Sequence, residues 1–187
     1  SCVGSNHSTL DAIRLMQQEK PFGKNDVAKI IVRGSQVTMD HVGWKYAPQG
    51  LTSAQLNLPY CVATWLLDGD CFVDQFTEDK VADRARMALA GKVEVVHDPE
   101  ITALGAKSRH KVHVEAHLND GAVMKRTVEA ARGSEKKFAT DAEGIQHEEL
   151  DAVAHFLRDR LVLEARDEFR HAAGVGVISY RLMSHVP

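Results

Sequence analysis

The stretch that decides the fold is Asn57-Leu58-Pro59-Tyr60-Cys61-Val62-Ala63-Thr64-Trp65-Leu66-Leu67-Asp68-Gly69. Its interior is apolar apart from Tyr60 and Thr64, so a helix formed here would be apolar on nearly every side. Such a helix is stable only inside a domain, where other elements cover it. We therefore expect this helix to be the most buried one, with the rest of the chain packed around it.

Both ends of the predicted helix carry recognisable signals. Asn57 can cap the N-terminus, which places Pro59 in the first turn, where a missing N–H costs little. Asp68 and Gly69 end the helix, and Gly69 suits the left-handed position after the last turn.

Tyr60 has two interpretations. Its hydroxyl lies near the free N–H groups and the positive dipole end of the helix, a position that favours a bound anion. Alternatively, Tyr60 is a core residue whose hydroxyl bonds a nearby carbonyl, which residue type and position alone favour.

Composition excludes several classes of protein. The chain has 187 residues, of which 44% are hydrophobic and 26% charged, as in globular proteins. A net charge of -3 argues against a nucleic-acid partner. We find neither an apolar run that could span a membrane nor a signal peptide, and expect a cytoplasmic protein. Its three cysteines, an odd count without metal-ligand spacing, fit reduced cytosolic thiols. Since the chain begins without methionine, it is either a processed product or a piece of something longer.

The remaining pattern predicts an α+β fold, a mostly antiparallel sheet with helices packed on one face. The clearest strand is 111–118, where apolar residues alternate with polar ones, and Asn119-Asp120-Gly121 predicts a hairpin to a strand at 122–129. The other expected elements are helices at 9–19 (capped by Ser8) and 78–90, strands at 27–32 and 93–96, irregular segments at 34–51, 71–76 and 99–108, a polar linker at 132–140, and C-terminal helices at 141–161 and 163–172.

These residues resemble the C-terminal domain of the MmgE/PrpD family, which comprises 2-methylcitrate dehydratases, cis-aconitate decarboxylases and iminodisuccinate epimerases. The most specific similarity is Leu58-Pro59-Tyr60-Cys61-Val62-Ala63 followed by Leu66-Leu67-Asp68-Gly69. Weaker similarities keep the family order: Ser1-Cys2-Val3-Gly4-Ser5-Asn6-His7 with Leu10-Asp11-Ala12, then Phe76-Thr77-Glu78-Asp79, Leu118-Asn119-Asp120-Gly121 and Arg132-Gly133-Ser134.

The resemblance implies a division of the molecule. Family members combine a large all-helical domain with a smaller α+β lid, and the active site lies in the cleft between them. By this similarity, residues 1–134 are the lid, residues 135–187 are a diverged helical segment, and the large helical domain is missing from the chain. We expect a homodimer that acts on a small anionic polycarboxylate without a metal or other cofactor.

The family pattern also assigns two catalytic residues, His7 in the loop before the first lid helix and Tyr60 in the central helix. The family reactions are dehydration, decarboxylation and epimerisation, and each needs a proton moved beside a carboxylate. Histidine is a general acid or base near neutral pH, and tyrosine is normally a proton donor there.

The chain departs from the family at two places. Gln55 stands where many members have a basic residue, which removes a partner for a substrate carboxylate. Lys137-Phe138 stands where the family usually has Asn-Pro, and the sequence beyond is diverged.

Other candidate residues have simpler explanations. His113, Glu115 and His117 share one strand face and could hold a metal, although solvated side chains on an open sheet face are commoner. We expect Arg84, Arg86 and Lys92 to be solvated and Cys61 to be core. Cys2 lies beside His7, but a catalytic thiol needs a positioned base.

Two functions follow. The chain is either the lid of a cofactor-independent lyase or isomerase, incomplete without its helical domain, or a stand-alone lid-like module that binds a partner or dimerises without catalysis.

Overall fold

The central helix, α4 (Leu58–Asp68), begins and ends as the sequence predicts. The Asn57 side-chain oxygen accepts a hydrogen bond from the Tyr60 backbone N–H at 2.8 Å, and Gly69 closes the helix with φ of 74°. Every residue from Leu58 to Thr64 is buried, as is Leu66. The computed structural model describes residues 2–134 and 137.

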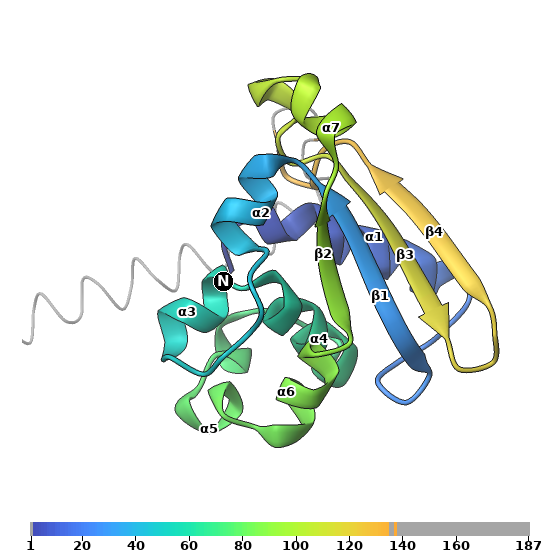
Figure 1. Ribbon diagram of the computed structural model, residues 1–187. Helices are drawn as coiled ribbons and strands as arrows, with labels where there is room; N and C mark the ends of the chain where they lie inside the picture. The colour runs from blue at the N-terminus through green and yellow to red at the C-terminus, as the bar shows by residue number, and fades with distance from the viewer. Residues whose placement is uncertain (1, 135–136, 138–187) are drawn as a thin grey trace, which may run out of the picture. The chain divides into compact units, whose positions relative to one another are not determined.

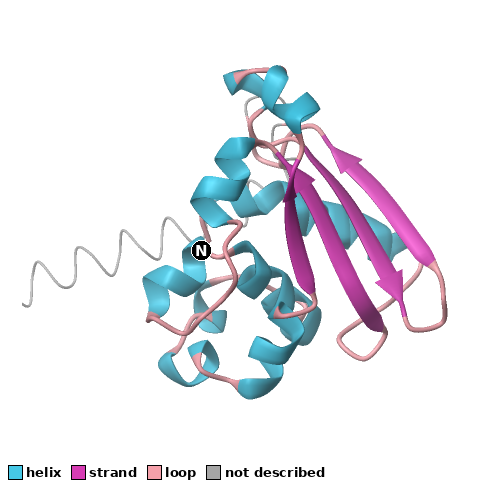
Figure 2. Cartoon of the chain, in the orientation of Figure 1, coloured by secondary structure: helices cyan, strands magenta, loops and turns pink. Residues whose placement is uncertain are grey.

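The sheet has four strands in the order β2-β1-β3-β4 (Figure 2). Strand β1 (Val27–Gly34) pairs in parallel with β2 (Val93–His97) and antiparallel with β3 (Val112–Leu118), which pairs antiparallel with β4 (Val123–Val128). Two of the three pairings are antiparallel, so the predicted α+β class with a mostly antiparallel sheet is confirmed.

One face of the sheet is covered by helices. The predicted alternation in β3 is correct: Val112, Val114, Ala116 and Leu118 are buried, and the residues between them are partly exposed. Helix α1 (Gly4–Glu19) contacts β3, β4 and α4, and Figure 1 shows it passing behind the strands. The core therefore lies between this face, α1 and α4.

Shorter helices surround this core (Figure 1). They are α2 (Gln36–Val42), α3 (Leu51–Leu56), α5 (Glu78–Val81), α6 (Arg84–Ala90) and α7 (Pro99–Ala103), with 3-10 turns η1 (Val73–Gln75) and η2 (Ala106–Ser108). Within the described residues, none of the helices has the length and apolar character that crossing a membrane requires.

The first helix begins five residues earlier than predicted, so His7 lies in its second turn and not in a loop. Ser8 is buried inside the helix and does not cap it. The cause is tertiary packing. The Val3 N–H and the Asn6 side-chain amide both donate to the Gln55 carbonyl at 3.2 Å, and these bonds hold the early residues against the end of α3.

Local caps explain the other differences. The predicted 78–90 helix is broken in two because Asp83 caps α6, accepting from the Arg86 N–H at 2.8 Å. Segments predicted as irregular contain α2 and α7, which Ser35 and Asp98 cap. The predicted C-terminal helices lie outside the described residues.

The interpretation of Arg86 as a solvated residue is wrong. Its side chain is buried, and its guanidinium pairs with Asp68 at 3.1 Å, close to the end of α4. An arginine is buried in this way when a carboxylate partner and an aromatic face replace water, and the Tyr60 ring centroid lies 5.8 Å away.

Replacing Leu66 with alanine should therefore lower the free energy of unfolding by about 2–5 kcal/mol, because it leaves a cavity beneath α4. Leu104, which is 54% exposed, is the matched control, and Leu104→Ala should change stability by less than about 0.5 kcal/mol. Denaturant titration measures both. Equal, small effects in the two variants would mean that α4 is not the core helix.

Candidate functional site

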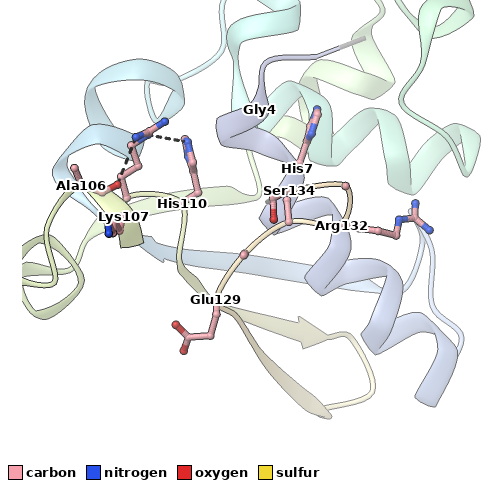
Figure 3. Close-up of a pocket in the computed structure, with 12 residues that line it drawn as sticks. Gly4, His7, Ala106, Lys107, His110, Glu129, Arg132 and Ser134 are labelled. Atoms are coloured by element: carbon pink, nitrogen blue, oxygen red, sulfur yellow. Dashed lines mark hydrogen bonds between the residues drawn. The ribbon is translucent and has the colours of Figure 1, made fainter. Parts of the chain in front are cut away.

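His7 lies at the rim of a pocket of about 390 Å³. The ring is exposed, and its Nε2 lies 3.1 Å from the Cys2 carbonyl oxygen. Three segments line the pocket: the start of α1, residues 106–110 around η2, and residues 129–134 after β4 (Figure 3). The lining residues are Gly4, His7, Ala106, Lys107, Arg109, His110, Glu129, Ala130, Ala131, Arg132, Gly133 and Ser134.

Buried hydroxyl groups fix the segment around η2. Ser35 donates a hydrogen bond to the Arg109 carbonyl at 2.6 Å, and Thr38 donates to the same oxygen at 3.3 Å. On the opposite wall, Gly133 has φ of 79°, a conformation that glycine adopts without strain, and so turns the chain after β4. The pocket is therefore built by loops that the sheet and α2 hold in place.

The charged residues of the lining are mainly cationic. Lys107, Arg109 and Arg132 carry permanent positive charge, and Arg132 also lies 4.0 Å from the Asp11 carboxylate. The one lining carboxylate, Glu129, is paired with Lys111 at 2.9 Å. A pocket with this balance of charge favours an anionic ligand.

Two histidines in the pocket differ in protonation. Burial, together with the charges of Arg109, His41 and His7, lowers the pKa of His110 below its usual value, so its ring is neutral at pH 7. Arg109 Nε donates to His110 Nε2 at 3.0 Å, which leaves the proton on Nδ1. Within the described residues this Nδ1 is buried and has no hydrogen-bond partner. A hydrogen bond with Cys2, by contrast, raises the pKa of His7.

Tyr60 does not line this pocket. Its side chain is fully buried, with ring centroids of Tyr46 and Phe76 at 4.7 and 5.9 Å, and its hydroxyl donates to the Gln75 carbonyl at 3.4 Å. Burial raises the pKa of Tyr60, and the nearby Arg86 lowers it. The structure thus places Tyr60 in a core environment, apart from the pocket that His7 lines, and its catalytic role stays a prediction.

The family model for the MmgE/PrpD C-terminal domain matches residues 1–149. The chain belongs to the MmgE/PrpD family. It is 27% identical over 148 residues to the cis-aconitate decarboxylase-like protein oryM of Aspergillus oryzae, and 29% identical over 143 residues to a cis-aconitate decarboxylase of Aspergillus terreus. These alignments cover 75% and 71% of this chain, but only 30% and 29% of the relatives.

Most of the pocket was missed by sequence reasoning in this MmgE/PrpD domain. Lys107 lies in a segment expected only to be irregular, and Arg109 and His110 lie between that segment and the strand predicted from residue 111. Their signal was the basic run from Lys107 to Lys111, which has four basic residues in five positions. Charge clustering of this kind can mark an anion site even where no secondary structure is expected.

The structure separates the two other candidate clusters, the polar residues of β3 and the cysteines. His113 bonds Thr127 at 2.7 Å and Glu115 pairs with Lys125 at 3.2 Å, so these side chains have partners on the exposed sheet face. Cys2, Cys61 and Cys71, whose spacing gave no sign of a site, have their sulfur atoms within 4.8 Å of one another.

His110 gives the site a pH-dependent contribution to stability. An unfolded histidine titrates near 6.5, and the folded His110 has a lower pKa. Below about pH 6.5 the unfolded chain therefore binds a proton that the folded chain does not. This proton uptake favours the unfolded state, so the free energy of unfolding falls as the pH is lowered. Urea titrations of wild type and His110→Asn from pH 7.5 to 5 should show a steeper loss in wild type. Parallel curves would contradict the prediction.

Proposed function

We propose that this chain is the lid domain of a lyase or isomerase that acts on small di- or tricarboxylates without a cofactor. Its family membership supports a lyase-type reaction, as does its similarity to a cis-aconitate decarboxylase and a cis-aconitate decarboxylase-like protein. The observation that carries the proposal is the pocket itself, which combines His7 with a cationic lining.

In this proposal the pocket holds a substrate carboxylate. Arg109 presents a planar guanidinium that suits two carboxylate oxygens. Lys107 and Arg132 add positive charge around the same space. Each is a fixed donor or charge aimed at an anion, which is the kind of preorganised electrostatic group that stabilises charge developing beside a carboxylate.

His7 is the group proposed to move the proton, because it lies at the rim of the pocket beside the bound anion. Tyr60 is proposed as a second donor. Since its hydroxyl now bonds Gln75, this role requires that bond to be exchanged for a substrate oxygen in the complete enzyme. General acid–base groups contribute about 100- to 10,000-fold to rate.

The helical domain is part of the proposal. The chain spans about 30% of the length of the relatives it matches. We propose that the remaining length supplies the large helical domain and the other wall of the cleft, and that the complete protein is a cytoplasmic homodimer. The chain alone should accordingly bind an anion but turn over little or none.

Anion binding can be measured on the chain alone. By calorimetry, cis-aconitate should bind, and Arg109→Gln should weaken binding at least about tenfold, since a hydrogen bond to a charged group contributes about 1.5–3 kcal/mol. Lys125→Gln, which removes the same charge from the exposed face of β4, is the matched control and should change affinity little. Equal weakening in both variants would show that only net charge matters and that the pocket is not the site.

Turnover tests the catalytic assignments. The encoding gene, sequenced upstream of Ser1, should continue in frame into a helical domain, and the full product should convert methylcitrate, cis-aconitate or iminodisuccinate.

In that protein His7→Gln and Tyr60→Phe should each lower kcat at least about tenfold, while Tyr60→Phe should cost only about 1 kcal/mol of stability. Near-normal kcat in both folded variants would remove these residues from catalysis. Clear turnover by the short chain alone would contradict the lid proposal, and a full product without turnover would favour the binding-module alternative.

A further inference from the structure

Three cysteine thiols from distant parts of the chain meet at one point in the core. Cys2 precedes α1, Cys61 lies in α4, and Cys71 follows α4 in the turn toward η1. Their sulfur atoms all lie within 4.8 Å of one another, and none is in a disulfide. Cys61 is fully buried, Cys71 is 7% exposed, and Cys2 is partly buried.

We propose that Cys2, Cys61 and Cys71 form a binding site for one soft metal ion, Zn²⁺ in the first place, held by three sulfur ligands. Zinc–sulfur bonds of about 2.3 Å in a tetrahedral arrangement separate the sulfurs by about 3.8 Å. The three sulfurs therefore need to close by about 1 Å or less to reach this spacing.

Ligand chemistry narrows the choice of ion. Thiolates select soft or borderline ions such as Zn²⁺, whereas Mg²⁺ and Ca²⁺ prefer oxygen ligands. On binding, each S–H bond is broken and its proton leaves to solvent, while a sulfur electron pair forms the bond to zinc, so no electron is transferred.

One hydrogen-bond donor is directed at the thiol cluster. The Asn6 side-chain amide donates a hydrogen bond to Cys61 Sγ at 3.2 Å, and the same nitrogen donates to the Gln55 carbonyl, which fixes its direction. An N–H donor aimed at a ligating sulfur is a common outer-sphere support of a metal site.

Simpler explanations account for fewer of these observations. A buried free cysteine ordinarily behaves as a small apolar residue. Apolar packing accounts for each thiol separately, but neither for the convergence of three sulfurs nor for the amide donor directed at one of them. The strand residues His113, Glu115 and His117 are the competing metal candidate, and they carry internal partners on an exposed face.

The bound ion would have a structural role. A bound ion would join the residues before α1 to α4 and to the turn that follows it. Because His7 is five residues from Cys2 and its Nε2 contacts the Cys2 carbonyl, the ion would also hold the start of α1 at the rim of the pocket. This inference does not depend on the reaction proposed above, since the ion is not assigned a part in it.

The test uses the full chain, purified with its thiols reduced and free of metal, and Co²⁺ as a spectroscopic probe. We expect one Co²⁺ per chain with sulfur-to-cobalt charge-transfer absorption, abolished by equimolar Zn²⁺ and unaffected by Mg²⁺. Zn²⁺ should also raise the Tm, because it binds the folded state. Cobalt bound without charge-transfer absorption, or no binding at all, would overturn the proposal.

Variants locate the ion. Cys2→Ser, at the least buried of the three positions, should abolish the charge-transfer absorption and weaken Zn²⁺ binding at least tenfold. The double variant His113→Ala/His117→Ala is the control and should keep both. Retention of Zn²⁺ binding in Cys2→Ser, with its loss in the histidine variant, would assign the ion to the strand face and reject the thiol site.

A second measurement uses the wild-type chain, so it does not depend on whether a variant folds. In wild type, alkylation by iodoacetamide followed by peptide mass mapping should show Cys2, the most exposed of the three thiols, protected by Zn²⁺ but not by Mg²⁺. Equal alkylation with and without Zn²⁺, or a disulfide between two of these cysteines under the same reducing conditions, would contradict the proposal.

Discussion

The packing of α1 against α4 is the interaction on which the rest of this domain depends. Helix α4 is apolar on nearly every side, so it must be covered, and α1 packs beside it, with α4 in contact with β2 and α1 with β3 and β4. The two helices are also joined by direction-dependent bonds: Trp65 Nε1 donates to Gln17 at 2.8 Å, and Asn6 donates to Cys61. Apolar burial drives the association, and these polar bonds select one register for it.

That register has consequences for the candidate site. It fixes the first turns of α1, and so sets His7 at the edge of the pocket while the rest of the lining comes from loops beyond β2 and β4. The same contact brings Cys2 to Cys61 and Cys71. A single helix packing therefore positions both the proton-moving group proposed for the reaction and the sulfur cluster proposed for zinc, although the two use different atoms and face different surroundings.

The fold could be predicted from the sequence where the signal was local. The cap at Asn57, the stop at Gly69, the alternation in β3 and the hairpin at Asn119–Gly121 each follow from a few adjacent residues, and each is observed. The start of α1 could not be predicted, because its early residues are held by Gln55, which is 49 positions from Asn6. The burial of Arg86 could not be predicted for the same reason, since its partner Asp68 belongs to another helix.

The candidate site was predicted only in part for a related physical reason. Pattern and resemblance singled out His7 and Tyr60 as individual residues, but a pocket is defined by which loops meet, and no local rule brings residues 106–110 to residues 129–134. The same holds for the cysteines, since metal-ligand spacing in sequence describes ligands on one hairpin or loop. Here the three thiols come from three separate segments, so only packing could bring them together. Both the family resemblance and the structure bear on His7. The resemblance selected it, and its place beside both Cys2 and a cationic pocket follows from α1 packing against α4.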